Sequence, residues 1–145
     1  MSPFTRIASI FMVAMLFTLI PSIDANSSGK IGQSSSGCTC HQTDAMIMPS
    51  FTGLPSQYTP GATYSLTWTG SGMSSSGQGG FNLDASAGTW SNLGNRVKAV
   101  NGELTHSNAG QRSWTADWTA PAVGTGDVTF KIAVLYANGN SQNSN

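Results

Sequence analysis

The stretch DVTFKIAVLY, residues 127–136, decides the fold class of this 145-residue chain. Successive side chains of a β-strand point to opposite faces of the sheet, so a half-buried strand carries an apolar residue at every second position. Branched and aromatic side chains also favour extended backbone. The stretch therefore predicts a strand whose buried face is formed by Val128, Phe130, Ile132, Val134 and Tyr136.

The same alternation recurs in three stretches nearer the N-terminus, and Gly, Pro or Ser residues lie between them. Each stretch predicts a further strand with one apolar face. Together with the absence of a helical period after the first 25 residues, they predict an all-β domain built as an antiparallel sandwich, with a barrel as the alternative. The three stretches are YSLTWT at residues 64–69, FNLDASAGTW at residues 81–90 and SWTADWTAP at residues 113–121.

The stretch VKAVNGELTH, residues 97–106, predicts a β-hairpin. A two-residue type I′ turn needs positive φ at both central positions, which Asn and Gly accept. The Asn-Gly pair at the centre of the stretch therefore sets the register, in which Val97 faces His106 and Ala99 faces Leu104.

The first 25 residues have the pattern of a signal peptide. A positive charge precedes an apolar run at residues 7–20, which is too short to span a bilayer comfortably, and the small residue Ala25 offers a cleavage point. An uncleaved N-terminal anchor is the alternative. Both interpretations place the rest of the chain outside the cytoplasm, secreted or attached to the cell surface, with no other membrane anchor visible in the sequence.

Residues 26–45 are rich in Ser and Gly, and we expect them to form a flexible tether ahead of a sandwich at residues 46–145. The last eight residues, NGNSQNSN, are polar. The sandwich is therefore expected to lack a final strand, or the chain is a fragment.

Composition limits the function. The chain has 6 Lys and Arg against 6 Asp and Glu, so it carries no basic footprint for nucleic acid. The acidic residues form no close pair for acid-base catalysis, and no serine lies in a nucleophile-elbow context. We therefore expect a protein that is not an enzyme.

Four phrases resemble the Reeler domain, the module named for the N-terminus of reelin. The resemblance covers residues 48–139. The chain is similar in particular to microbial secreted proteins in which the domain follows a CxxCH-like segment. It implies an immunoglobulin-like β-sandwich outside the cell, although the disulfide cysteines of the eukaryotic form are absent from this domain. The phrases are YTPGATYSLTW, GGFNLDASAGTW, LTHSNAG and SWTADWTAPAVGTGDVTFKIAVLYANG.

Both cysteines and one of the two histidines lie in CTCH, residues 38–41. A c-type haem is attached through Cys-x-x-Cys-His, where the histidine ligates the iron. Here the spacer is one residue short. The leading interpretation is haem c held by Cys38, Cys40 and His41, with His106 or a methionine, Met46 or Met48, as the sixth ligand.

Other interpretations of CTCH remain open. Zinc or copper could be held by Cys38, Cys40, His41 and His106, although the spacing is tighter than in ordinary zinc fingers. The cysteines could instead form a strained disulfide within the chain or a disulfide between chains, or the cluster could have no specific role. His106 alternates with Leu104 on an apolar face, which favours a buried, hydrogen-bonded histidine over a metal ligand.

Two functions follow from these observations. The first is a secreted or cell-surface binding or adhesion module whose partner is an extracellular protein or a glycan. The second is an extracytoplasmic electron-transfer protein that carries haem at CTCH and meets a redox partner.

The four tryptophans offer a glycan-stacking platform, but core packing is the favoured role. They are Trp68, Trp90, Trp114 and Trp118.

Overall fold

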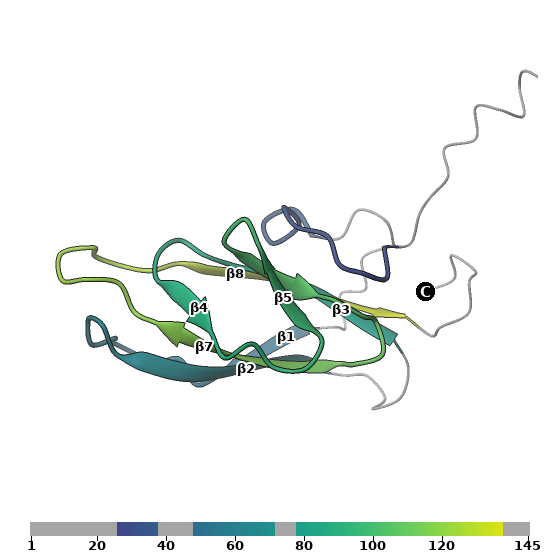
Figure 1. The fold of residues 1–145 in the computed structure, drawn as a ribbon, viewed down its shortest axis with the longest axis horizontal. Helices are drawn as coiled ribbons and strands as arrows, with labels where there is room; N and C mark the ends of the chain where they lie inside the picture. The colour runs from purple at the N-terminus through teal and green to yellow at the C-terminus, as the bar shows by residue number, and fades with distance from the viewer. Residues whose placement is uncertain (1–25, 38–47, 72–77, 138–145) are drawn as a thin grey trace, which may run out of the picture.

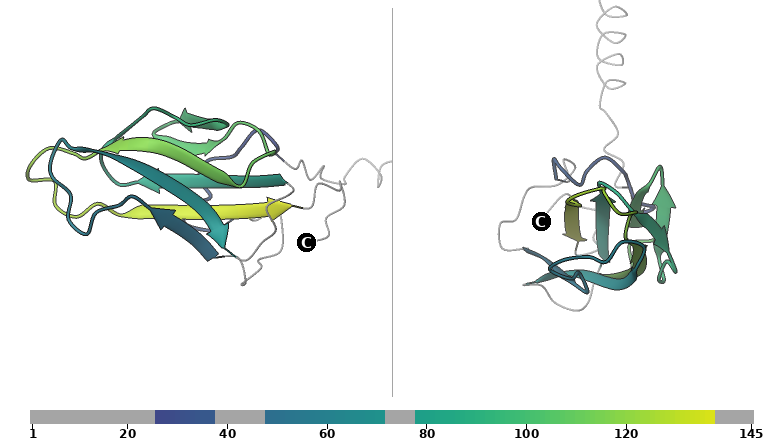
Figure 2. Two further views of the ribbon diagram at one scale, coloured as in Figure 1. Left: turned by 90° about the horizontal axis from the view of Figure 1, so that it is seen from below. Right: turned by 90° about the vertical axis from the view of Figure 1, so that its left-hand side faces the viewer.

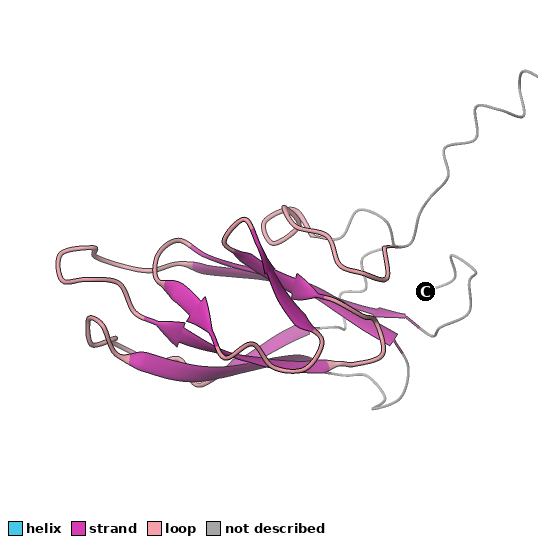
Figure 3. Ribbon diagram, viewed as in Figure 1, coloured by secondary structure: helices cyan, strands magenta, loops and turns pink. Residues whose placement is uncertain are grey.

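A computed structural model describes residues 26–37, 48–71 and 78–137 of the chain. In these residues all the regular structure is β-strand (Figure 3). The strands are β1 (Met48–Thr52), β2 (Thr63–Ser71), β3 (Gln78–Ala85), β4 (Thr89–Ser91), β5 (Val97–Val100), β6 (Glu103–His106), β7 (Ser113–Thr119) and β8 (Phe130–Ala137).

The strands form two four-stranded sheets, in the orders β1-β2-β7-β4 and β5-β6-β3-β8 (Figure 1). Every pairing is antiparallel. Figure 2 shows the two layers from two further directions. The prediction of an all-β antiparallel sandwich is confirmed.

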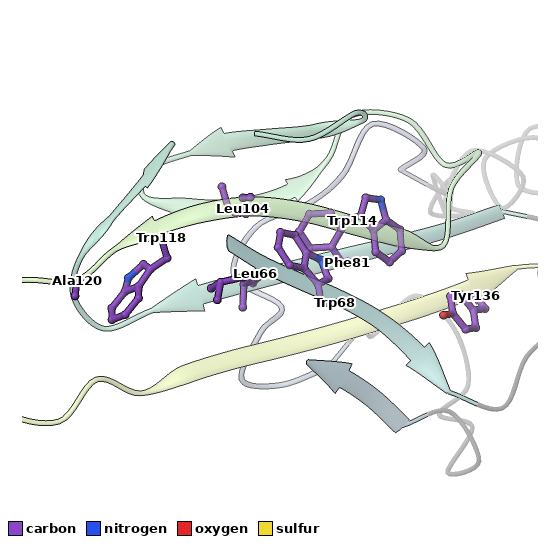
Figure 4. Close-up of a cluster of buried hydrophobic side chains, with 10 residues drawn as sticks. Leu66, Trp68, Phe81, Leu104, Trp114, Trp118, Ala120 and Tyr136 are labelled. Atoms are coloured by element: carbon purple, nitrogen blue, oxygen red, sulfur yellow. The ribbon is translucent and has the colours of Figure 1, made fainter. Parts of the chain in front are cut away.

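The core lies between the layers and is rich in tryptophan (Figure 4). Trp68 on β2 and Trp114 on β7 are directly opposite each other in the register, and both are fully buried. Phe81 projects from the other sheet, with its ring centroid 5.0 Å from that of Trp68 and 4.8 Å from that of Trp114. This aromatic cluster joins the two sheets, because burial of such large apolar surfaces is the main favourable term in folding.

The predicted hairpin is formed by β5 and β6. Asn101 has a φ of 51° and Gly102 a φ of 88°, as a type I′ turn requires. Val97 is paired with His106 and Ala99 with Leu104. The turn residues therefore set the register that the sequence predicts.

Strand β8 begins later than the alternation predicts, because Val128 lies before it rather than in it. The connection from β7 contains Gly124 and Gly126, both with positive φ, and the Tyr58 hydroxyl donates a hydrogen bond of 2.6 Å to the Gly126 carbonyl. These turns keep the backbone from extending until Phe130. The short strand β4 is a further element that the sequence analysis did not separate.

A second link between the sheets lies near the other end of β8. The Tyr136 hydroxyl donates to the Gly70 carbonyl oxygen over 2.8 Å and also accepts from the Gly70 amide. A Cβ at Gly70 would lie 2.7 Å from the Tyr136 hydroxyl and 2.8 Å from its ring. Glycine is therefore required for this contact between β2 and β8.

Candidate functional site

The predicted cofactor residues Cys38, Cys40 and His41 lie outside the described residues, as do residues 1–25. Their assignment to haem, another metal or a disulfide stays a prediction. The boundaries of the predicted signal peptide, tether and sandwich at residues 1–25, 26–45 and 46–145 also stay predictions. The structure does describe the segment that leads to CTCH, residues 26–37.

This segment, which we call the N-terminal strap (residues 26–37), is bound to the sheet β5-β6-β3-β8 (Figure 1). The Asn82 side-chain oxygen accepts hydrogen bonds from the backbone amides of Gln33, at 2.7 Å, and Ser34, at 2.8 Å. The Asn82 side-chain amide donates to Glu103 Oε2 and to the Leu104 carbonyl. Both ends of the Asn82 side chain are therefore satisfied, although it is only 1% exposed.

Further contacts continue along β6. Glu103 Oε2 accepts from the Gly32 amide over 2.9 Å, and the Thr105 hydroxyl lies 3.3 Å from the Lys30 carbonyl oxygen. Gly29 passes so close to the backbone of His106 that a Cβ would overlap its carbonyl oxygen. The described part of the expected flexible tether is thus attached to the sandwich by specific contacts.

His106, the described member of the predicted metal set, is 9% exposed. Its Nδ1 accepts a 3.1 Å hydrogen bond from the Phe81 amide, and its ring packs so closely on Gly80 that a Cβ there would lie 2.6 Å from Cε1. Burial lowers the pKa of His106 below its ordinary value of 6.5, and the positive charge of Lys98 lowers it further. Hydrogen bonds that the ring can donate to the backbone of Phe81, whose carbonyl oxygen lies 3.4 Å from Nδ1, and of Asn26 oppose this shift of the pKa.

These contacts match the expectation of a buried, hydrogen-bonded histidine. Within residues 26–37, 48–71 and 78–137, no group of three or more His, Cys, Asp or Glu side chains is arranged to hold a metal ion. The role of His106 as a ligand together with CTCH stays a prediction. Met48 begins β1 and is 62% exposed.

The tryptophans serve the core rather than an exposed platform. Trp68, Trp114 and Trp118 are at most 1% exposed, so they offer no open face on which a sugar could stack. Trp90 is partly buried, and its indole nitrogen donates to the Gly102 carbonyl over 3.1 Å. The favoured role in packing is confirmed for the three buried tryptophans.

A cavity of about 570 Å³ opens where the β1–β2 and β7–β8 connections approach each other. Its volume falls in the range of small-ligand sites, roughly 300 to 1,000 Å³. The two connections supply most of the lining, and β7 and the start of β8 supply the rest. The lining residues are Leu54, Pro55, Ser56, Gln57, Tyr58, Trp118, Asp127, Val128 and Phe130.

Aromatic rings make one wall of this cavity. The Trp118 ring meets Tyr58 edge-on with a centroid distance of 5.9 Å, and it meets Phe130 edge-on at 5.0 Å. The Trp118 indole nitrogen donates to the Ala87 carbonyl over 3.0 Å, which fixes the ring. Because Tyr58 and Phe130 are only partly buried, they can contact a ligand while Trp118 holds them in place.

Asp127 is the charged group of the cavity lining. It is exposed, and no hydrogen bond or ion pair engages it within the described part of the chain. Sequence reasoning missed this site because its residues come from two connections about 65 to 75 positions apart, without a motif. The signal in the sequence was the presence of Pro and Gly residues in both connections.

The two facing antiparallel sheets, with the tryptophan-rich core between them, define a β-sandwich. Two crystal structures of the human F-spondin reeler domain have this fold. The first has a TM-score of 0.53 and 22% identity and is matched over 65% of this chain and 83% of that one. The second has a TM-score of 0.52 and 22% identity, over 74% of this chain and 81% of that one.

A third match is the crystal structure of the Reelin-N domain of F-spondin, with a TM-score of 0.50 and 22% identity over 78% of this chain and 82% of that one. This likeness shows that the chain has a Reeler-like fold. No protein-family model matches the sequence, and no curated protein matches it. Among the described residues, no helix is long and apolar enough to cross a membrane.

Proposed function

We propose that this protein is a secreted or cell-surface binding module with a Reeler-like fold, without catalysis of its own. The cavity between the β1–β2 and β7–β8 connections is its binding site. The partner is an extracellular protein or a glycan. The observation that carries the proposal is the cavity itself, in which partly exposed rings and polar side chains converge on one end of a rigid sandwich.

Two physical arguments support a binding role for this end of the molecule. Loops mounted on a rigid β-sandwich carry binding residues in many proteins, because they vary without disturbing the core. Apolar side chains are also exposed here, since Leu54 is 39% and Val123 is 84% exposed. Exposed apolar residues next to a concave aromatic site favour contact with another molecule.

The binding role is tested on an array of extracellular matrix proteins and glycans, probed with the labelled, purified protein. We expect saturable binding to at least one member. Leu54→Lys places a positive charge in the apolar part of the cavity lining and should weaken that binding about tenfold or more, because an apolar contact with the partner is replaced by a charge. Leu93→Lys is the matched control, since Leu93 is 38% exposed, close to the 39% of Leu54, and does not line the cavity.

Two results would contradict the proposal. One is an array without any saturable binding. The other is binding that Leu54→Lys leaves intact, which would place the interface elsewhere on the protein. Circular dichroism and thermal unfolding of both variants establish that each is folded before the affinities are compared.

Secretion is the second part of the proposal. It rests on the predicted signal peptide at residues 1–25, and it requires export and cleavage after Ala25. Expression of the full sequence in a secreting host should release a protein into the medium that begins at Asn26, as N-terminal sequencing would show. Retention of the uncleaved chain in the membrane fraction would support the anchor interpretation instead.

A further inference from the structure

We propose that the cavity binds a basic side chain, lysine or arginine, presented by an extracellular protein partner. This inference rests on the proposed function, because it assigns a ligand class to the same site. The cavity combines an unpaired carboxylate, that of Asp127, with the partly exposed rings of Tyr58 and Phe130. An organic cation on an apolar stem complements both.

The charge argument comes from comparing Asp127 with the other carboxylates among the described residues. Glu103 accepts from the Gly32 amide and the Asn82 side chain. Asp117 accepts from the Ser65 hydroxyl and the Asn92 side chain, and Asp84 lies opposite Lys131 in the register of β3 and β8. Asp127 has no such neighbour among the residues that the structure describes, and it lines the cavity, so its charge is available to a ligand.

The apolar walls of the cavity complement the alkyl stem of the ligand. The alkyl stem of lysine or arginine buries well against rings and aliphatic side chains while the charged end stays near a polar group. Here Tyr58, Phe130 and Val128 supply the apolar wall. Aromatic faces also attract cations, by about 0.5 to 1 kcal/mol at exposed sites. The pairing of ring and carboxylate therefore favours a cation over a neutral apolar group.

The source of the cation is argued from the surroundings of the cavity. Leu54 in the cavity lining is 39% exposed, and Val123, on the β7–β8 connection outside the lining, is 84% exposed. A free small cation would leave these residues in water. A basic side chain on a protein would bring further surface that covers them, so a protein partner accounts for both the cavity and its rim.

The test is a titration followed by ¹H–¹⁵N NMR, with the Trp118 indole and the Asp127 amide as reporters. The probes are the N-acetyl methylamides of lysine, arginine and norleucine, and choline. Norleucine matches the length of the lysine stem but lacks the ammonium group. Because the probes are small, we expect dissociation constants of about 1 mM for lysine or arginine, and about fivefold weaker binding for norleucine.

Matched variants isolate the carboxylate. Asp127→Asn keeps the shape of the side chain and should reduce lysine or arginine binding to about the norleucine level, a loss of threefold to fivefold as for partly exposed ion pairs. Asp84→Asn, which removes a carboxylate outside the cavity lining, should leave binding unchanged.

The remaining outcomes overturn the inference in distinguishable ways. Equal binding of norleucine and lysine would show that the cavity has no preference for a cation. It would still show an apolar binding site, in agreement with the proposed function. Tighter binding of choline than of lysine and arginine would show that the ligand is a quaternary ammonium compound and not the side chain of a protein. The absence of shifts with every probe would remove the inference, while the array experiment with Leu54→Lys decides the proposed function separately.

Discussion

The side-chain oxygen of Asn82 lies 2.7 Å from the backbone nitrogen of Gln33, although 49 residues separate them in the chain. The same oxygen accepts the Ser34 amide at 2.8 Å. Asn82 therefore attaches residues 33 and 34 of the N-terminal strap to the sandwich, a short distance before CTCH. Its own side chain is buried, so its removal leaves donors on both partners unsatisfied.

Substitution of this residue gives the first prediction. Asn82→Ala should lower the free energy of unfolding by about 1 to 3 kcal/mol, the usual cost of leaving buried polar groups unpaired. It should also release the strap locally. Hydrogen exchange measured by NMR should show protected amides at Gln33 and Ser34 in the original protein, with protection reduced about tenfold or more in the variant.

Gln33→Ala is the control for that experiment. The bond to Asn82 is made by the backbone amide of Gln33, which alanine retains. This variant should therefore keep the protection at Ser34. Equal protection in the original protein and in Asn82→Ala would show that the strap is held by other contacts, such as that between Glu103 and the Gly32 amide.

The buried histidine gives a prediction about pH. The folded protein lowers the pKa of His106, chiefly by burial, so the folded state takes up its proton at a lower pH than the unfolded state. Between the ordinary value of 6.5 and the lowered value, the unfolded chain therefore binds more protons. Stability should be unaffected by this group above about pH 7 and should fall as the pH drops below 6.5, by at most about 1.4 kcal/mol per pH unit.

Urea unfolding at pH 7.5, 6.5 and 5.5 measures this effect. His106→Gln should remove that part of the pH dependence, whereas His41→Gln should leave it in place. Lys98 on β5 is the charged neighbour that also lowers the pKa, so Lys98→Gln should reduce the slope modestly. If the original protein and His106→Gln lose stability in parallel, the titrating group lies elsewhere.

The local pattern of the sequence predicted most of the sandwich. The apolar faces of β2 and β7 are buried as the alternation predicts, and a single Asn-Gly pair fixed the hairpin of β5 and β6. On β3 both faces are buried from Gly79 to Leu83, and the strap binds Asn82 on the face that the alternation leaves polar. The pattern failed where local preference was not decisive. Val128 continues the alternation of β8, but two positive-φ glycines before it hold the backbone in turns.

A local sequence pattern could not predict the strap or the cavity. The strap binds through backbone amides, which every residue except proline carries, so its sequence does not mark the contact. The Asn82 side chain that receives it looks like any polar residue on the outer face of a strand. The cavity needs Tyr58, Asp127 and Phe130 to meet across two connections, and that meeting depends on the sheet topology.

The core tryptophans differ in one respect that can be measured. The Trp118 indole nitrogen donates to the Ala87 carbonyl, whereas the buried indole nitrogen of Trp114 has no hydrogen-bond partner among the described residues. Replacement by phenylalanine removes a similar volume at both positions. Trp118→Phe should therefore cost about 1 kcal/mol more than Trp114→Phe, the typical contribution of one hydrogen bond, as measured by urea unfolding. Equal losses, or a larger loss at Trp114, would contradict this account.

The cysteine cluster gives the last prediction. The sandwich core contains no cysteine within the described residues, so Cys38→Ser/Cys40→Ser should shift the thermal midpoint of the apoprotein by less than about 2 °C. An unfolded double variant would show that the cluster is required for folding.

The same pair of proteins, expressed in a host that attaches haem, tests the electron-transfer interpretation. Covalent haem at CTCH requires a Soret band that survives denaturation in the original protein and is absent from the double variant. A colourless protein with two reactive thiols would exclude both haem and a disulfide, because each consumes the thiols.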